Sequence, residues 1–218
     1  AEVSYSKNIA RGDAGMGILR NIFGPSKEEV WRELCNQIDA EFVDGGFWKG
    51  DKVRARFKQW TITLDTYTVS TGKSSTTYTR LRAPFVNAEG FHFTVYRKGF
   101  FTPLGKLFGI QDLEIGDPWF DEEFVIQGSS EKHLRQFFSS ERVRQLIHSQ
   151  PTINLTVIDD EGWFGEEFPN GVDELRFTTV GVIKDVARLR ALYDLVAESL
   201  NQLCHIGSAY EDDPHLHF

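Results

Sequence analysis

Residues 52–69 read KVRARFKQWTITLDTYTV, and the alternation in this stretch decides the class of the fold. Successive side chains of a β-strand point to opposite faces of a sheet, so a period of two indicates a strand with two unlike faces. In the first part, four basic side chains alternate with small or apolar ones: Lys52, Arg54, Arg56 and Lys58. In the second part, three apolar side chains alternate with polar ones: Trp60, Ile62 and Leu64. We therefore predict two adjacent antiparallel strands, each with an apolar face for a core and a polar face that meets water.

Similar patterns continue on both sides of this stretch. Runs rich in β-branched and aromatic residues predict further strands over 42–48, 76–85, 91–97, 120–128, 152–158, 162–168 and 174–181. Most of the connections are short and contain Gly, Asn or Asp, which favours antiparallel meanders. Arg80 and Arg82 alternate within one of these strands, so we expect them to extend the basic face.

Three stretches carry the signals of a helix start. Ser26 and Glu29 have the spacing of a capping box, in which the serine oxygen accepts from a backbone N–H and the glutamate reaches back. Ser-Ser-Glu occurs at 129–131 and again at 139–141, and each places a serine cap before an acidic first turn. Apolar residues at helical spacing follow each start, so we predict three helices with one buried face each.

A fourth helix is predicted near the C-terminus from a stripe of apolar residues. Their spacing alternates between four and three residues: Val182, Val186, Leu189, Tyr193, Val196, Leu200 and Leu203. Such a stripe is typical of a long amphipathic helix that lies across a sheet, and we favour this interpretation. The alternative is a coiled-coil seam, in which case 182–203 joins two copies in a structural homodimer.

These elements together predict an α+β protein in which antiparallel β-meanders pack on helices and a long amphipathic helix comes last. We expect one domain over 26–205, preceded by a glycine-rich arm over 1–25 and followed by a polar tail over 206–218. Gly46-Phe47-Trp48 and Gly162-Trp163-Phe164 start corresponding meanders. They raise the hypothesis of a degenerate duplication with halves 26–97 and 119–205.

The composition excludes several classes of protein. The chain has 218 residues, of which 40% are hydrophobic, enough for a substantial core. It contains no apolar run long enough for a transmembrane helix, and its first residues lack the apolar core of a secretory signal. The two cysteines, Cys35 and Cys204, do not make a disulfide framework, so we expect small buried side chains in a reducing, cytoplasmic setting.

Two groups of residues have the types found in cofactor or metal sites. Gly72-Lys73-Ser74 matches the end of a phosphate-binding loop, but the earlier glycine is missing and the segment joins two strands. Metal-ligand types gather near the C-terminus: Cys204, His205, His215 and His217. They lack the close paired spacing of structural zinc sites, so we expect no metal and no cofactor.

Acidic residues form two clusters, at Asp117–Glu123 and at Asp159–Glu161. Paired carboxylates can hold a divalent cation or act as general acid and base, which is the chemistry of a metal-dependent hydrolase. Turns and exposed strands of an acidic protein produce the same clusters without any function. A hydrolase is therefore an alternative, and we name no catalytic residue.

The basic face is the candidate binding site: Lys52, Arg54, Arg56, Lys58, Arg80 and Arg82. It suits an anionic small molecule, a lipid head group or an acidic protein segment. Nucleic acid is disfavoured, because the net charge is -8 and the isoelectric point is near 5.3. The other interpretation is internal pairing, for example with Asp65, since the second half of the chain is strongly acidic. We predict a non-enzymatic binding or interaction module.

The stretch Gly116-Asp117-Pro118-Trp119-Phe120-Asp121-Glu122-Glu123-Phe124-Val125, followed by capped helices, resembles a pattern in a family of uncharacterised bacterial soluble domains. The resemblance covers about residues 30–205. It implies a bacterial source and a stand-alone soluble domain of unknown function. It implies no activity and supplies no catalytic residue.

Overall fold

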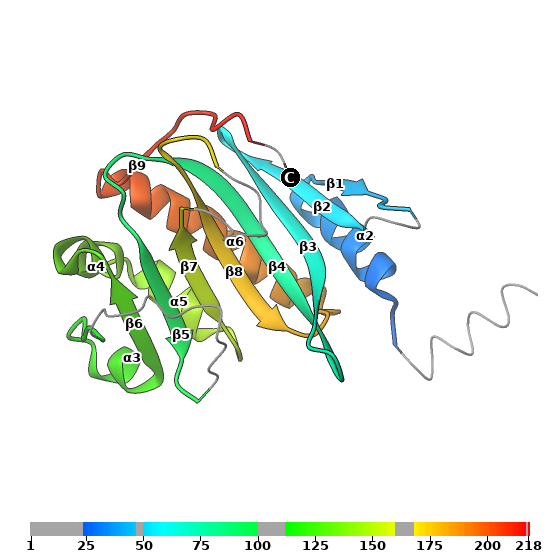
Figure 1. Cartoon of the computed structure of the whole chain (residues 1–218), viewed down its shortest axis with the longest axis horizontal. Helices are drawn as coiled ribbons and strands as arrows, with labels where there is room; N and C mark the ends of the chain where they lie inside the picture. Colours follow the sequence, from blue (N-terminus) through cyan, green and yellow to red (C-terminus); the bar gives the residue numbers. More distant parts are fainter. Residues whose placement is uncertain (1–23, 47–49, 100–111, 160–167, 217) are drawn as a thin grey trace, which may run out of the picture.

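The computed structural model describes residues 24–46, 50–99, 112–159, 168–216 and 218. Within them, nine strands form one antiparallel sheet, and helices lie behind it in the view of Figure 1. The strands are β1 Glu41–Val43, β2 Lys52–Phe57, β3 Trp60–Ser70, β4 Ser75–Asn87, β5 Phe93–Arg97, β6 Phe124–Gly128, β7 Asn154–Ile158, β8 Val172–Val180 and β9 Ala209–Tyr210. The helices are α2 Lys27–Ile38, α3 Pro118–Glu123, α4 Glu131–Phe137, α5 Glu141–His148 and α6 Val186–His205. The predicted α+β class is confirmed.

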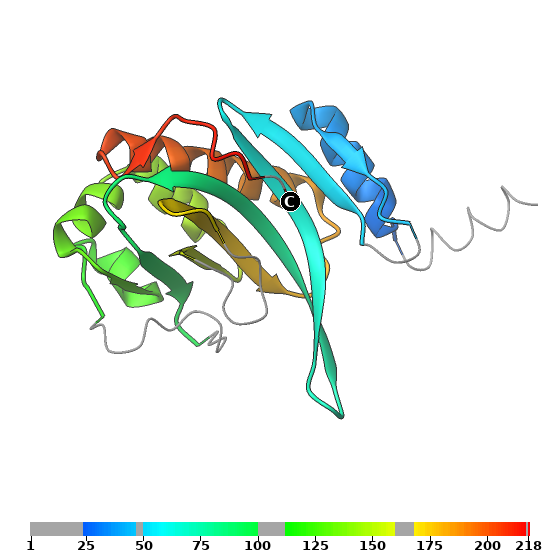
Figure 2. The same ribbon diagram turned by 45° about the horizontal axis from the view of Figure 1, so that its top comes forward.

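The sheet has the strand order β1-β2-β3-β4-β8-β7-β5-β6, with β9 paired to the end of β4. The first four strands form the predicted meander, which Figure 2 shows as a curved ribbon. The next strand along the chain, β5, pairs only with β6 and β7 among the described strands, and β8 joins β4. The two halves of the chain therefore interlock, and the duplication remains a hypothesis.

One row of side chains crosses the sheet from β2 to β6 on the face that the helices cover. Its members are paired strand by strand, are all apolar and are at most 3% exposed: Val53, Leu64, Leu81, Phe177, Leu155, Val95 and Ile126. Because strand side chains alternate in direction, a register that buries this row must turn the neighbouring row to the opposite face. The apolar core thus fixes where the polar face lies.

The helix starts follow the predicted caps. Ser26 and Glu29 form the full capping box at α2. In both Ser-Ser-Glu sequences the second serine is the cap, since Ser130 accepts from the amide of His133 and Ser140 from the amide of Val143. Satisfied N-terminal amides explain why helices as short as α4 and α5 begin where they do.

Two predicted boundaries are wrong. The strand predicted over 120–128 begins only at Phe124, because Asp117 caps α3 and Pro118 occupies its first turn, where proline is favourable. The last helix begins at Val186 rather than Val182, because the side chain of Asp185 accepts from the amide of Arg188. Most of the strand predicted over 162–168 falls outside the described residues, as does the arm up to residue 23.

The apolar stripe of α6 packs into the core of its own chain. Four of its leucines and valines are fully buried: Leu189, Val196, Leu200 and Leu203. Tyr193 is half-buried, and its hydroxyl donates to the carbonyl oxygen of Arg56 at 3.4 Å. Burial, with the nearby Asp194 charge, raises the pKa of Tyr193 to about 12. This arrangement is that of an amphipathic helix lying across a sheet.

The C-terminal segment, expected to be a polar tail, contributes to the fold. β9 pairs with β4, Ala209 is buried, and Phe218 is only 4% exposed. The segment passes from the end of α6 towards the sheet face opposite the helices (Figures 1 and 2). It therefore lies close to the basic strand.

Candidate functional site

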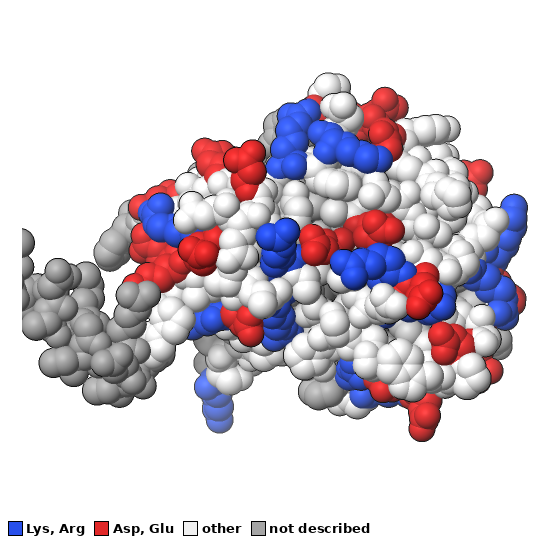
Figure 3. All heavy atoms as spheres, turned by 180° about the vertical axis from the view of Figure 1, so that it is seen from behind, with Lys and Arg blue, Asp and Glu red and all other residues white. Residues whose placement is uncertain are grey.

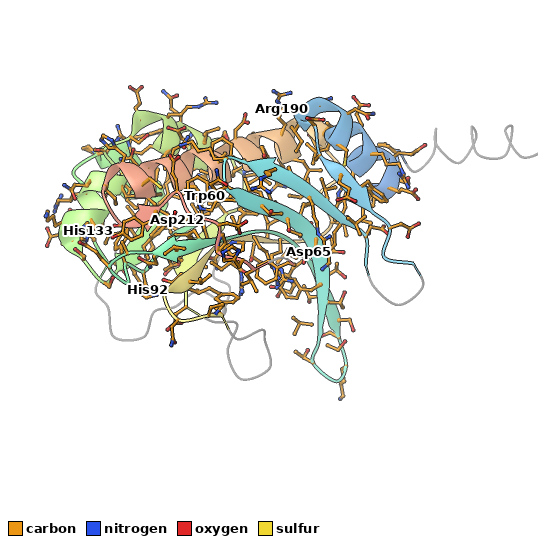
Figure 4. All side chains as sticks on the ribbon, turned by 90° about the horizontal axis from the view of Figure 1, so that it is seen from above. Trp60, Asp65, His92, His133, Arg190 and Asp212 are labelled. Carbon is orange, nitrogen blue, oxygen red and sulfur yellow. The ribbon has the colours of Figure 1, made fainter. Side chains whose placement is uncertain are left out.

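The face of the sheet opposite the helices is polar from one edge to the other. A row of side chains crosses it, each paired with the next across neighbouring strands: Arg54, Thr63, Arg82, Arg176, Thr156, Thr94 and Gln127. Figure 4 shows the helices on one side of the sheet and a dense layer of side chains on the other. The register thus brings Arg54 and Arg82 to either side of Thr63, as the alternation predicted.

The middle of this polar face is not open to water, which corrects the expectation from its alternation, whereas Arg56 at the β2 edge is exposed. Thr63 is fully buried, and Arg82 is 3% exposed. One cause is the C-terminal segment, since the ring of Phe218 packs against Arg82. The ring of Phe168 lies against Phe218 in turn, with the two centroids 6.0 Å apart. Sequence alternation identifies the polar face but does not reveal that a distant segment covers it.

Lys58 departs from the predicted alternating strand. β2 ends at Phe57, and Lys58 has a φ of 53° in the turn before β3. Its ammonium group forms an ion pair with the carboxylate of Glu211, in the C-terminal segment. The fourth cation of the basic stretch thus lies at the hairpin turn and holds another part of the chain.

Arg80 is paired within the sheet. Its Nε and Nη2 donate to the two carboxylate oxygens of Asp65, each at 2.9 Å. The guanidinium carbon also lies 4.9 Å from the centroid of the Tyr67 ring. A bidentate pair of this kind is strong and directional, so Arg80 and Asp65 stabilise the β3–β4 pairing.

Arg82 belongs to a buried charge cluster. Its Nε lies 3.5 Å from a carboxylate oxygen of Glu174, which is fully buried on β8. Arg176 pairs with the same carboxylate. The guanidinium carbon of Arg82 lies 3.3 Å from the centroid of the Phe218 ring. One carboxylate thus serves two guanidinium groups.

Arg54 and Arg56 line a pocket at the β1–β2 edge. The pocket has a volume of about 360 Å³ and is bounded by Asp39, Glu41, Arg54, Ala55, Arg56 and Thr61. Arg54 Nε donates to the main-chain oxygen of Phe218 at 2.7 Å, and Arg56 Nε donates to the carbonyl of Lys58 at 3.2 Å. Within the described part of the chain, neither guanidinium group forms an ion pair. Lys52 lies farther along β2, half-exposed.

On the helix-covered side, the described charged residues are of mixed sign (Figure 3). Figure 3 shows this face, on which Lys and Arg side chains are interspersed with Asp and Glu. Among the pairs on helices are Arg32 with Glu28 and Arg135 with Glu131, each one turn apart. Such exposed pairs are typical of solvated helices.

A second polar cluster surrounds His92, which precedes β5 (Figure 4). Its Nε2 lies 3.1 Å from a carboxylate oxygen of Asp173, and the amide of Asn87 donates to that same oxygen. The bond to Asp173 raises the pKa of His92 despite partial burial. Asp173 borders a pocket of about 340 Å³ together with Asp159. The sequence held no signal for this cluster, because its members are brought together by the β4–β8 pairing.

In the cluster at Asp117–Glu123, three carboxylates each have a separate structural contact. Asp117 caps α3 and lies 3.2 Å from Arg144, while Asp121 accepts from the amides of Ile115 and Gly116 at 2.9 Å each. Glu123 forms an ion pair with Arg97. In the second acidic cluster, Asp159–Glu161, both Asp160 and Glu161 fall outside the described residues. The hydrolase alternative therefore depends on this second cluster alone.

The remaining metal-ligand and thiol residues are placed as follows. In the described part of the chain, no three His, Cys, Asp or Glu side chains are arranged to hold a metal ion. His215 is exposed, and His217 lies outside that part. Cys35 is buried and Cys204 half-buried, both are free, and burial raises the pKa of each thiol. A raised pKa makes a thiol less reactive, so these side chains act as small apolar groups.

None of the described helices has both the length and the apolar character needed to cross a bilayer.

Comparison with known proteins adds little to this description. No protein-family model matches the chain, and no curated protein matches it. These results agree with the resemblance to uncharacterised proteins. Among solved structures, the crystal structure of the mycobacterial trehalose monomycolate transport factor A, TtfA, matches 83% of this chain and 93% of its own, at 11% identity and a TM-score of 0.45. A similarity this low shows neither a shared function nor a shared family.

Proposed function

We propose that the protein is a non-enzymatic binding module whose basic sheet face holds the anionic group of a small molecule. The predicted site consists of Lys52, Arg54, Arg56, Lys58, Arg80 and Arg82. The observation that carries the proposal is the pocket of about 360 Å³ that Arg54 and Arg56 line together. Two adjacent guanidinium groups present planar donors that match a carboxylate or a phosphate.

The six residues divide into two roles. Arg80, Arg82 and Lys58 each have a carboxylate partner within the chain, at Asp65, Glu174 and Glu211 respectively. We assign these three to the support of the face, and Arg82 in addition presents its guanidinium plane to an aromatic ring. Arg54 and Arg56, with Lys52 beside them, supply the charge that a ligand meets. The division follows from Coulomb energy, because a cation already paired with a carboxylate attracts a second anion less strongly.

The pocket also limits the kind of anion. Asp39 and Glu41 border it, so a dense polyanion such as nucleic acid would bring phosphates against carboxylates. A ligand with one localised anionic group meets the arginines without that repulsion. A lipid head group and an acidic protein segment are the other expected partners, and we place the activity in the cytoplasm.

The test replaces the two arginines of the pocket. In Arg54→Gln with Arg56→Gln, affinity for inorganic phosphate and for citrate should fall by about tenfold or more, since a hydrogen bond to a charged group contributes about 1.5–3 kcal/mol. The matched control is Lys132→Gln with Arg142→Gln, two exposed cations on α4 and α5, which should leave affinity unchanged. Isothermal titration calorimetry gives both values.

Vesicles of phosphatidylglycerol provide the comparison with a lipid surface. Binding of the vesicles that survives both arginine substitutions, or equal loss of phosphate binding in the two double variants, would contradict the assignment of the pocket. No measurable heat with phosphate, citrate or vesicles in the unmodified protein would contradict the proposed function as a whole.

A further inference from the structure

The C-terminal segment already occupies the basic face. Three of the six candidate residues contact it: Lys58 pairs with Glu211, Arg54 donates to the oxygen of Phe218, and Arg82 lies over the Phe218 ring. Phe218 itself is only 4% exposed. The C-terminal segment, which belongs to the acidic second half of the chain, thus lies on the basic face of the first half.

The contacts of Phe218 define the chemistry of the position that it fills. Its main-chain oxygen lies 2.7 Å from Arg54 Nε, and its ring centroid lies 3.3 Å from the guanidinium carbon of Arg82. The ring of Phe168 meets it at 61°, close to edge-on. The position therefore combines a charged donor for an oxygen with a guanidinium that stacks on an aromatic ring.

A second observation comes from Thr63, which lies between Arg54 and Arg82 in the register. Thr63 is fully buried, and its hydroxyl has no hydrogen-bond partner among the described residues. An unpaired buried hydroxyl costs about 1–3 kcal/mol. A ligand oxygen bound at this position would satisfy it, whereas the phenyl ring of Phe218 offers no acceptor there.

We propose that Arg54, Thr63 and Arg82 form a seat for an aromatic carboxylate, and that Phe218 fills this seat in cis as a competitor of the ligand. The inference rests on the proposed function and names its ligand class. Glu211 tethers the segment through Lys58, an exposed ion pair that contributes little free energy, so a ligand can displace the segment. Because Phe218 is tethered, its effective concentration at the seat is high. A ligand must therefore bind the seat tightly enough to compete with it.

The test compares 3-phenylpropionate, which has a ring beside a carboxylate, with propionate, which lacks the ring. In Phe218→Ala, affinity for 3-phenylpropionate should rise by about tenfold or more over the unmodified chain, because the competitor is lost. Adding Arg54→Gln to this variant should remove the gain. Propionate should bind every variant more weakly than 3-phenylpropionate does. Chemical-shift titration by NMR gives the dissociation constants.

A second variant keeps the seat intact. Glu211→Gln removes the ion pair to Lys58 and should raise affinity for 3-phenylpropionate by about two- to fivefold, the effect of one exposed pair. This variant leaves Phe218 in place, so it tests competition even if Phe218→Ala does not fold.

The outcomes separate this inference from the proposed function. If phosphate binds and depends on Arg54 and Arg56, but Glu211→Gln and Phe218→Ala leave the affinity for 3-phenylpropionate unchanged, only the seat and its competitor are wrong. Equal affinity for propionate and 3-phenylpropionate would likewise overturn the ligand class. If no anion binds any variant, the proposed function itself is wrong.

Discussion

At the scale of single residues, the basic face is built from charges that differ in their partners. Asp65 is 6% exposed and binds Arg80 with both oxygens, whereas Arg54 and Arg56 bind main-chain oxygens and a side-chain amide oxygen among the described residues. A buried pair holds its partners in place, because removing either one leaves the other charge uncompensated. Arginines without such a pair can exchange a weaker acceptor for a ligand anion.

His92 makes stability depend on pH. Its hydrogen bond to Asp173 raises the folded-state pKa above the unfolded value of about 6.5. The stabilisation is therefore fully present below about pH 6.5 and is lost as pH rises through the raised folded pKa. In His92→Gln, the fall in unfolding free energy between pH 5.5 and pH 8.5 should be smaller than in the unmodified protein. Urea denaturation at the two pH values measures it.

The control for this prediction is His205→Gln, an exposed residue at the end of α6 that forms no ion pair with the described residues. Replacing this exposed side chain should change the unfolding free energy by less than about 0.5 kcal/mol. An unchanged pH dependence in His92→Gln would show that the Asp173 contact contributes nothing to stability.

Predictability from sequence at this scale depends on distance along the chain. The pairing of Arg80 with Asp65 follows from two neighbouring strands and a short turn, so alternation was enough to anticipate it. The contact of Arg54 with Phe218 joins residues 164 positions apart and the contact of His92 with Asp173 crosses the β4–β8 pairing. No local pattern encodes such contacts, because they depend on how whole strands are ordered.

At the scale of elements, local signals located most helices and strands, and they failed where a cap overrode a pattern. Residues 120–128 contain an apolar run typical of a strand, yet Asp117 and Pro118 start a helix that includes Phe120. Capping satisfies amide groups that would otherwise lack partners, and here it favours a helix over 120–123, where we predicted a strand.

The paired serines allow capping to be measured with a neighbouring control. Ser140→Ala removes the side chain that accepts from Val143 at the start of α5, and it should lower the unfolding free energy by about 1 kcal/mol. Ser139→Ala removes an exposed bond to the carbonyl of Gln136 and should cost less than about 0.5 kcal/mol. Urea denaturation separates the two. Equal losses would contradict the assignment of Ser140 as the cap.

At the scale of the whole molecule, the pairing of β4 with β8 joins the two halves of the chain into one sheet. Nine residue pairs connect these strands, from Tyr78 with Val180 to Val86 with Val172. The apolar row on one face and the polar row on the other both cross this junction. The polar face and the segment that covers part of it therefore belong to one continuous sheet, although the sequence alone indicated only two successive meanders.

A continuous sheet should unfold as one unit, and a cavity made in one half should weaken the other equally. Leu155 lies on β7 in the second half and is fully buried, so Leu155→Ala should lower the unfolding free energy by about 2–5 kcal/mol. Trp31 and Trp60 are buried in the first half. With 5-fluorotryptophan incorporated, their fluorine resonances should report the same urea midpoint as far-UV circular dichroism, and Leu155→Ala should shift both by the same amount. Lys132→Ala, an exposed change on α4, should shift neither. If Trp31 kept its original midpoint in Leu155→Ala, the halves would be separate folding units, and the single domain over 26–205 would be wrong.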